Sequence, residues 1–82
     1  MTKKMYVGNL AFQSTEDDIE KLFNQFGEVK SVNLITDRET GRSRGFAFVE
    51  MSSEDADAAM QGLDGTNFEG RNLKINEARP RV

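Results

Sequence analysis

The chain has 82 residues and a formal net charge of −3, and it contains neither cysteine nor histidine. This length allows one domain with a modest core, and the composition excludes disulfides, thiolate or imidazole metal ligands, and catalytic cysteine or histidine. No apolar run approaches the ~20 residues of a membrane span and the N-terminus lacks the apolar stretch of a signal peptide, so we expect a cytoplasmic protein without a membrane segment.

The first predicted strand covers residues 4–10, where Tyr6 points to the face opposite Met5. A helix follows at residues 15–26, because apolar side chains recur there at spacings of three and four residues. A capping box is expected at its start, and Gly27 is expected to end it as residue C′. The capping box would consist of Thr15 and Asp18.

The middle of the chain predicts a β-hairpin. Residues 28–36 form its first strand, with Val32 and Leu34 facing inward. Residues 37–43 contain no apolar side chain and form the loop. Residues 44–51 form the second strand of the hairpin, which is the third strand of the chain.

The two faces of this third strand differ in a way that points to a function. Alternation places Arg44, Phe46, Phe48 and Glu50 on one face. The opposite face carries Gly45, Ala47, Val49 and Met51, a set typical of a core. A pair of outward phenylalanines beside an arginine needs a partner. Flat aromatic faces and positive charge suit unstacked bases and their phosphates.

The last part of the chain predicts a second helix at about residues 53–63 and a final strand at residues 71–77. Ser52 and Ser53 are expected to cap the helix. In the strand, Leu73 and Ile75 would face inward and Asn72, Lys74 and Asn76 outward. Two further aromatic residues receive no function: Phe12 is expected to pack in its loop and Phe68 to make a satellite core contact, with a partner surface as the alternative for Phe68.

This β-α-β-β-α-β order predicts an α+β fold of the ferredoxin-like type. The four-stranded antiparallel sheet would have the strand order 4-1-3-2. Each helix has one apolar stripe, so both helices should cover the same face of the sheet and leave the other face open. We expect a single domain at 1–82, with a core at about 4–77 and a short basic tail at 78–82.

The acidic residues are concentrated in the predicted helices. Seven of the fourteen acids lie there with only one of the eleven bases, Lys21, which gives the helices a charge of −6. Ten bases and seven acids outside the helices give +3. The net charge of −3 therefore does not exclude a polyanionic partner.

The first and third predicted strands resemble the motifs of a known family. Residues 44–51, Arg-Gly-Phe-Ala-Phe-Val-Glu-Met, match the RNP1 motif of the RNA-recognition motif (RRM) family at every specified position except the last, where Met51 replaces Phe or Tyr. Residues 5–10 resemble its RNP2 motif, and the likeness covers nearly the whole chain. Within the family, the chain is most similar to small single-RRM proteins of bacteria, cyanobacteria included. This closer likeness lies in residues 37–42, 48–51 and 70–74.

The resemblance implies a role for each matching residue. Tyr6 and Phe48 would each stack on a base, Phe46 would pack against a sugar, and Arg44 would meet the phosphate between the two nucleotides. Gly8 would leave room for a base close to the sheet. Further RNA contacts are expected from Lys4, Lys74, Asn76, Arg38, Arg42, Arg79 and Arg81.

We therefore expect a monomeric module that binds single-stranded RNA, in post-transcriptional RNA metabolism, with no cofactor and no metal. Single-stranded DNA stays a competing ligand, because stacking does not require the 2′-hydroxyl. Glu50 on the binding face and the net charge of −3 predict modest affinity. The acidic helix faces offer a docking surface for a basic protein partner.

Two other functions are compatible with the predicted fold. One is a protein-interaction module of the RRM fold, although such modules usually lose the RNP aromatic residues that this chain keeps. The other is an acylphosphatase-like enzyme, which would need a phosphate-binding loop with an arginine. The loop at residues 11–14 has neither glycine nor arginine, so we expect no enzymatic activity.

Overall fold

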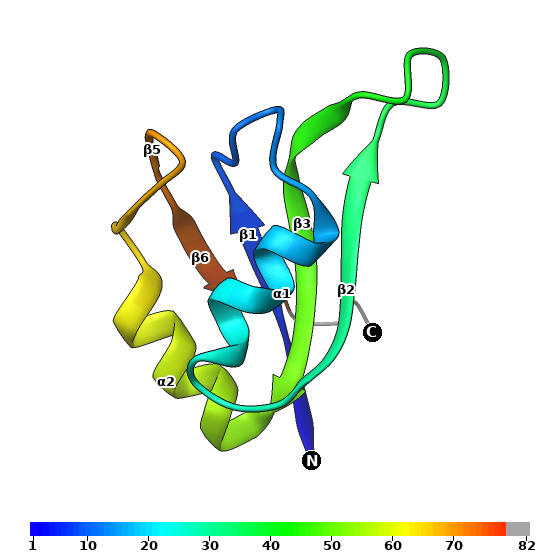
Figure 1. Ribbon diagram of the computed structural model, residues 1–82. Coiled ribbons are helices and arrows are strands. Elements are labelled where there is room, and N and C mark those ends of the chain that lie inside the picture. The colour runs from blue at the N-terminus through cyan, green and yellow to red at the C-terminus, as the bar shows by residue number, and fades with distance from the viewer. Residues whose placement is uncertain (79–82) are drawn as a thin grey trace.

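A computed structural model describes residues 1–78 of the chain, and its elements are shown in Figure 1. The strands are β1 (Thr2–Gly8), β2 (Val29–Thr36), β3 (Ser43–Ser52), β4 (Asn67–Phe68), β5 (Arg71–Asn72) and β6 (Lys74–Glu77). The helices within this range are α1 (Glu16–Asn24) and α2 (Ser53–Leu63). The loops β1–α1 and β2–β3 and the β4–β5 hairpin all lie at the same end of the molecule (Figure 1).

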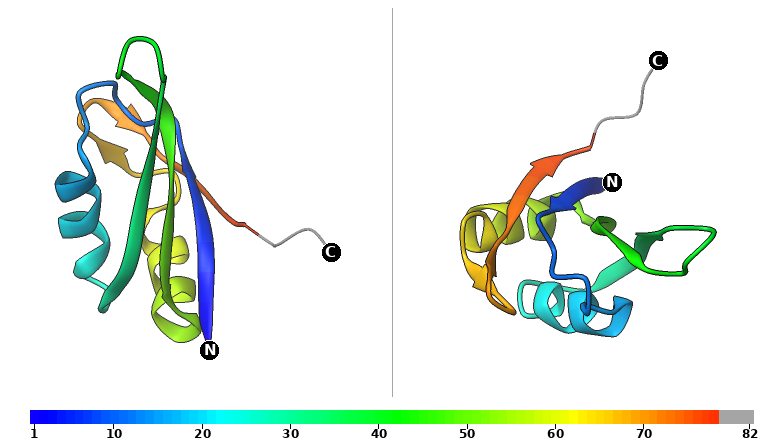
Figure 2. Two further views of the ribbon diagram at one scale, coloured as in Figure 1. Left: turned by 90° about the vertical axis from the view of Figure 1, so that its right-hand side faces the viewer. Right: turned by 90° about the horizontal axis from the view of Figure 1, so that it is seen from above.

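The main sheet contains β2, β3, β1 and β6 in that order, all antiparallel to their neighbours. This confirms the predicted order 4-1-3-2, with β6 as the fourth strand, and with it the ferredoxin-like α+β fold. Figure 2 shows α1 and α2 on one face of the sheet. Among the described residues no helix or strand covers the other face, which we call the open face.

The core lies between the helices and the sheet. The central strands contribute alternate residues to it, and Met5, Val7, Ala47, Val49 and Met51 are fully buried, as alternation predicted. The helices contribute Ile19, Phe23, Ala56, Ala59 and Leu63. The departure from the RNP1 pattern at Met51 therefore changes the core and does not reach the open face.

α1 begins at the predicted capping box. The hydroxyl of Thr15 accepts a hydrogen bond from the Asp18 N–H at 3.2 Å, and the Asp18 carboxylate accepts one from the Thr15 N–H at 3.1 Å. The bond from the Thr15 backbone is the main reason why the pKa of Asp18 lies below its ordinary value. The start of this helix is thus stabilised by a charged side chain.

The end of α1 differs from the prediction that Gly27 is residue C′. The last helical residue is Asn24, and the Phe26 N–H donates to the Phe23 carbonyl at 3.0 Å, which tightens the last turn and turns the chain away early. Gly27 instead allows a close approach to α2. A Cβ at this position would lie 2.2 Å from the Asp55 carboxyl carbon.

α2 has the predicted bounds, but its first turn is held differently. Ser52 is the N-cap, yet its side chain makes no capping hydrogen bond. The Met1 carbonyl instead accepts hydrogen bonds from the N–H of Ser53 at 3.0 Å and from its hydroxyl at 3.3 Å. The predicted serine cap is therefore replaced by a contact with the start of the chain. Neither of the two helices in residues 1–78 has the length and apolar character of a membrane-spanning helix.

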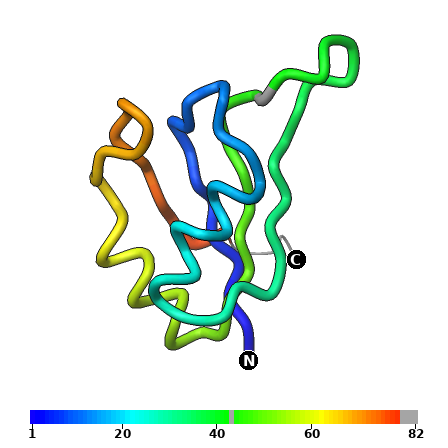
Figure 3. Tube along the Cα trace, in the orientation of Figure 1, coloured from blue at the N-terminus to red at the C-terminus, as the bar shows by residue number. Residues whose placement is uncertain are grey.

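The predicted final strand, residues 71–77, is divided in two. β5 pairs with β4 in a short hairpin, and β6 pairs with β1 at the edge of the main sheet. The division falls at Leu73, whose N–H donates to the Thr66 carbonyl at 2.9 Å and whose carbonyl accepts from the Gly65 N–H at 2.8 Å. Figure 3 shows the chain passing from α2 through this hairpin and returning along β6. Leu73 and Ile75 are buried, as predicted.

Candidate nucleic-acid interface

Tyr6, Phe46 and Phe48 form a continuous aromatic surface on the open face, which we call the aromatic platform. The ring centroids are 5.7 Å apart for Tyr6 and Phe46, 6.0 Å for Tyr6 and Phe48, and 6.1 Å for Phe46 and Phe48. These separations lie within the range of about 4.5–7 Å at which aromatic rings attract one another. Each ring is only partly buried. The rings therefore support one another while part of each stays accessible to a ligand.

The pairing of β1 with β3 brings the platform together. Tyr6 lies directly opposite Phe48 in the register, and the neighbouring pair, Val7 and Ala47, is fully buried on the helix side. Residues that share a face in neighbouring strands have side chains in contact. The predicted assignment of the three aromatic side chains to the open face is confirmed.

The space above Gly8 on the open face is occupied by the Tyr6 ring. A Cβ at Gly8 would lie 2.7 Å from Cε1 and 2.8 Å from the hydroxyl oxygen of Tyr6, so the Tyr6 ring already occupies the space above this glycine. Gly8 itself is buried. The missing side chain lets the Tyr6 ring lie close to the sheet. A direct contact of Gly8 with RNA stays a prediction.

Arg44 lies beside the platform although β3 is irregular at this point. The β2–β3 register shifts between Leu34 and Thr36, and Gly45 has a φ of 87°, a conformation that side chains other than glycine rarely adopt. Strict alternation therefore does not hold through Gly45. The exposed Arg44 nevertheless lines a hollow of about 250 Å³ together with two rings of the platform, Tyr6 and Phe46.

A row of polar side chains extends the platform across the sheet. Asn33 lies opposite Phe48 on the β2 side, and Asn76 lies opposite Tyr6 on the β6 side. A second hollow, of about 180 Å³, is lined by Lys4, Ser31, Asn33 and Phe48. Ser31 and Asn33 were not among the residues predicted to contact RNA. Alternation along the strand could have identified them, because Val32 and Leu34 were predicted to face inward and their neighbours Ser31 and Asn33 therefore face the open side.

Glu50 lies at the end of the open face nearest the N-terminus, opposite Lys4 on β1. Its carboxylate accepts a hydrogen bond from the Thr2 hydroxyl at 2.6 Å and one from the Ser31 hydroxyl at 3.4 Å. The expectation that a negative charge sits on this face is confirmed. The charge is held in place by two hydroxyl groups on the flanking strands.

The other predicted basic contacts within the described residues line neither of these two hollows. Lys74 is exposed on β6, next to β1. Arg38 and Arg42 are exposed in the β2–β3 loop, which projects beyond the end of the sheet (Figure 1), and neither lines the hollow beside Arg44. Arg79 and Arg81 lie outside the described residues.

The prediction that Phe12 packs in its loop is wrong. Its side chain is 65% exposed and lines the same hollow as Arg44. Leu10, Ala11 and Ser14 are the buried residues of this loop. The hydroxyl of Ser14 donates a hydrogen bond to the Glu69 carboxylate at 2.9 Å. Because the loop is anchored through Ser14, Phe12 is left outside.

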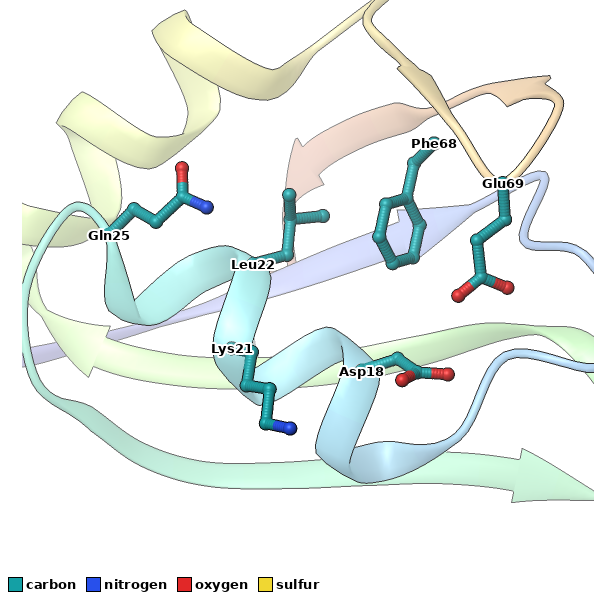
Figure 4. A pocket seen from close by; sticks show the side chains of 6 residues that line it. All are labelled: Asp18, Lys21, Leu22, Gln25, Phe68 and Glu69. Carbon is teal, nitrogen blue, oxygen red and sulfur yellow. The ribbon is translucent and has the colours of Figure 1, made fainter.

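A further hollow lies on the helix side of the molecule, away from the open face (Figure 4). It has a volume of about 240 Å³ and is lined by Asp18, Lys21, Leu22, Gln25, Phe68 and Glu69. Phe68 packs against the core, which confirms the predicted satellite contact. Across residues 1–78, no group of three or more His, Cys, Asp or Glu residues is arranged to hold a metal ion.

Comparison with known proteins identifies similar chains. The sequence model of the family described as RNA recognition motif matches residues 5–74. A candidate RNA-binding protein of the cyanobacterium Nostoc sp., RbpE, is 59% identical over 78 residues, which are 94% of this chain and 79% of that protein. The crystal structure of the RNA-binding protein PG1 superimposes with a TM-score of 0.92 at 48% identity over 98% of both chains. The structure of the Rna15 RRM with bound RNA (GU) has a TM-score of 0.85 at 31% identity and covers 94% of this chain and 83% of that chain.

Proposed function

This chain belongs to the RNA recognition motif family, and from that premise we propose that it binds single-stranded RNA on the open face of its sheet. The observation that carries the proposal is the aromatic platform: three partly exposed rings in mutual contact, with Arg44 at their edge. Most sheet faces that lack a covering layer are polar. An apolar and aromatic open face is suited to unstacked bases.

Each platform residue receives a specific role in this proposal. Tyr6 and Phe48 stack on two successive bases, and Phe46, whose ring lies at 86° to that of Phe48, packs against the sugar between them. Arg44 neutralises the phosphate that joins the two nucleotides. The Rna15 domain, which has a similar backbone, has been solved with RNA bound, and this likeness supports the proposal that the chain binds RNA.

Polar side chains around the platform contact the same RNA strand. Lys4, Asn33 and Asn76 flank the two stacking residues and offer hydrogen bonds to base edges or phosphates. Lys74 on β6 and Arg38 and Arg42 in the β2–β3 loop supply further positive charge. The protein acts as a non-enzymatic module in post-transcriptional RNA metabolism.

Modest affinity follows from these contacts. Stacking contributes about 1–3 kcal/mol per base. Two bases therefore contribute about 2–6 kcal/mol, which corresponds to dissociation constants from roughly 30 mM to roughly 40 μM before the entropy of ordering the strand is counted. Glu50 opposes a nearby phosphate. Single-stranded DNA of the same sequence offers the same bases and phosphates, and it therefore competes for the platform.

The test is a titration of isotope-labelled protein with short single-stranded RNA and DNA pools, with amide shifts mapped by NMR. We expect the largest shifts at the platform residues and a loss of affinity of about 5- to 150-fold in Phe48→Ala, which corresponds to about 1–3 kcal/mol. Phe68→Ala is the matched control, because Phe68 is also partly buried but lies on the helix side. It should lower thermal stability and leave RNA affinity unchanged.

Two results contradict the proposal. Shifts confined to α1 and α2, with none on β1 and β3, would show that nucleic acid does not bind on the platform. Equal losses of RNA affinity in Phe48→Ala and Phe68→Ala show that binding depends on fold stability and not on the platform.

A further inference from the structure

A fourth aromatic side chain, that of Phe12, lies close to a positive charge near the loop end of the open face. The carbon atom at the centre of the Arg71 guanidinium is 6.0 Å from the centroid of the Phe12 ring. Phe12 belongs to the β1–α1 loop and Arg71 to β5. Both line the hollow of about 250 Å³ that also contains Arg44 and the Tyr6 and Phe46 rings. The hollow is therefore continuous with the aromatic platform.

Hydrogen bonds hold this loop against its neighbours at several points. The Asn9 side-chain amide donates to the Asn72 carbonyl at 2.6 Å, next to Arg71 on β5. The Leu10 N–H donates to the Gly45 carbonyl at 2.8 Å. On the other side of Phe12, the hydroxyl of Ser14 donates to Glu69. The loop is thus fixed to β3 and to the β4–β5 hairpin, and Phe12 is presented in a defined place.

Phe12 is exposed and does not belong to the core, so core packing does not explain why an aromatic residue occupies this position. Its side chain is 65% exposed, whereas the other large apolar side chains of residues 2–78 are at least partly buried. The Phe12 ring has the Arg71 guanidinium beside it, and Arg44 lines the same hollow. This arrangement combines a stacking surface with charge for a phosphate. A nucleotide matches both features, because its base is flat and its phosphate is negatively charged.

Resting on the RNA binding proposed above, we propose that this hollow is a further nucleotide subsite. The base stacks on the exposed face of Phe12, and Arg71 neutralises the phosphate that connects this nucleotide to the one on the platform. Arg71 is exposed, so its long side chain can follow the strand with little loss of packing. RNA longer than two nucleotides then gains contacts that a dinucleotide does not reach.

The test compares dinucleotides with hexanucleotides of U, A and C in titrations followed by NMR. Phe12→Ala should weaken hexanucleotide binding by about 5- to 150-fold, the range for one stacked base. It should leave dinucleotide binding unchanged, whereas Phe48→Ala weakens both. Phe12→Tyr keeps the stacking face and should keep the affinity. Because Phe12 is exposed, thermal melting should not change in either Phe12 variant.

A second measurement tests the charge. Arg71→Gln should reduce the slope of log affinity against log salt by about 0.7 for the hexanucleotide, as expected for one lost phosphate contact. Lys21→Gln, which removes one positive charge from the helix side, is the matched control and should leave the slope unchanged.

The outcomes separate the two proposals. If hexanucleotides bind and Phe48→Ala weakens them but Phe12→Ala does not, the further subsite is wrong and the platform stands. If Phe12→Ala weakens dinucleotides as strongly as hexanucleotides, Phe12 acts on the platform and the subsite is also wrong. If the unaltered protein binds neither ligand, both proposals fail.

Discussion

The Tyr6 ring lies over Gly8 so closely that a Cβ on this glycine would be 2.7 Å from the ring. Gly8 follows Tyr6 by two residues on β1, so in a regular strand both face the same side of the sheet. Any other residue at this position would push the ring away from the sheet and from its contacts with Phe46 and Phe48. A residue without a side chain thereby sets the position of a proposed base-stacking surface.

Gly8→Ala should therefore weaken RNA binding by displacing Tyr6. We expect a loss of at least about five-fold, the lower limit for one impaired base stack. In a Tyr6→Ala background the same glycine substitution should have little further effect, because the ring on which it acts is gone. Isothermal titration of the four proteins measures this coupling. Independent, additive losses would show that Gly8 acts without Tyr6.

Glu50→Gln should strengthen RNA binding. The substitution removes a negative charge from the open face, and the glutamine oxygen can still accept the hydrogen bond from Thr2. A tightening of about 1.5- to 5-fold corresponds to the ~0.2–1 kcal/mol typical of exposed charge interactions. Glu54→Gln on α2 is the control for net charge. Equal gains in both variants would mean that total charge, and not the position of Glu50, limits the affinity.

Arg44→Gln should reduce the salt dependence of RNA binding. A lost phosphate contact lowers the slope of log affinity against log salt by about 0.7 for single strands. Arg38→Gln gives, for comparison, the slope after the loss of an exposed arginine in the projecting β2–β3 loop. Titrations at several salt concentrations give both slopes. An unchanged slope in Arg44→Gln would remove the assigned phosphate contact.

The capping box predicts a specific dependence of stability on pH. The hydrogen bond from the Thr15 N–H lowers the pKa of Asp18 in the folded state, so the unfolded chain binds this proton more readily. The stabilisation is fully present above the unfolded pKa, about 3.9, and is lost as the pH falls through the folded pKa. Asp18→Asn should therefore lower the melting temperature at pH 7.

Thermal melts from pH 7 to pH 2 check this prediction. The difference between Asp18→Asn and the unaltered chain should shrink below about pH 3.9, because the unaltered carboxylate also becomes neutral there. Asp17→Asn is the control, because it removes a neighbouring acid of the first turn that is not part of the capping box. A difference for Asp18→Asn that stays constant down to pH 2 would show that its charge does not stabilise the helix.

Local patterns were sufficient to predict most of the fold. The alternation around Tyr6 and Phe48, the capping box at Thr15 and the helical spacing of apolar residues each depend on side chains a few positions apart. The same alternation placed the aromatic platform on the open face, and the resemblance to the RRM family supplied its proposed roles. The end of α1, the cap of α2 and the division of the last strand were not predicted, because each depends on hydrogen bonds or packing that a local pattern does not encode.

The amino-acid pattern by itself determined the order of the two helices and the four strands of the main sheet, the buried face of the two central strands, and the family, because side-chain periodicity and short motifs are local properties. Only the tertiary structure decided that Tyr6 covers Gly8, that Glu50 is held by hydroxyls from two strands, and that Phe12 stands exposed beside Arg71. Phe12 and Arg71 are far apart in the chain and meet because the β1–α1 loop is tied to β5 by the bond from Asn9 to the Asn72 carbonyl. Such contacts join residues of no fixed spacing, so they appear only when the chain is folded.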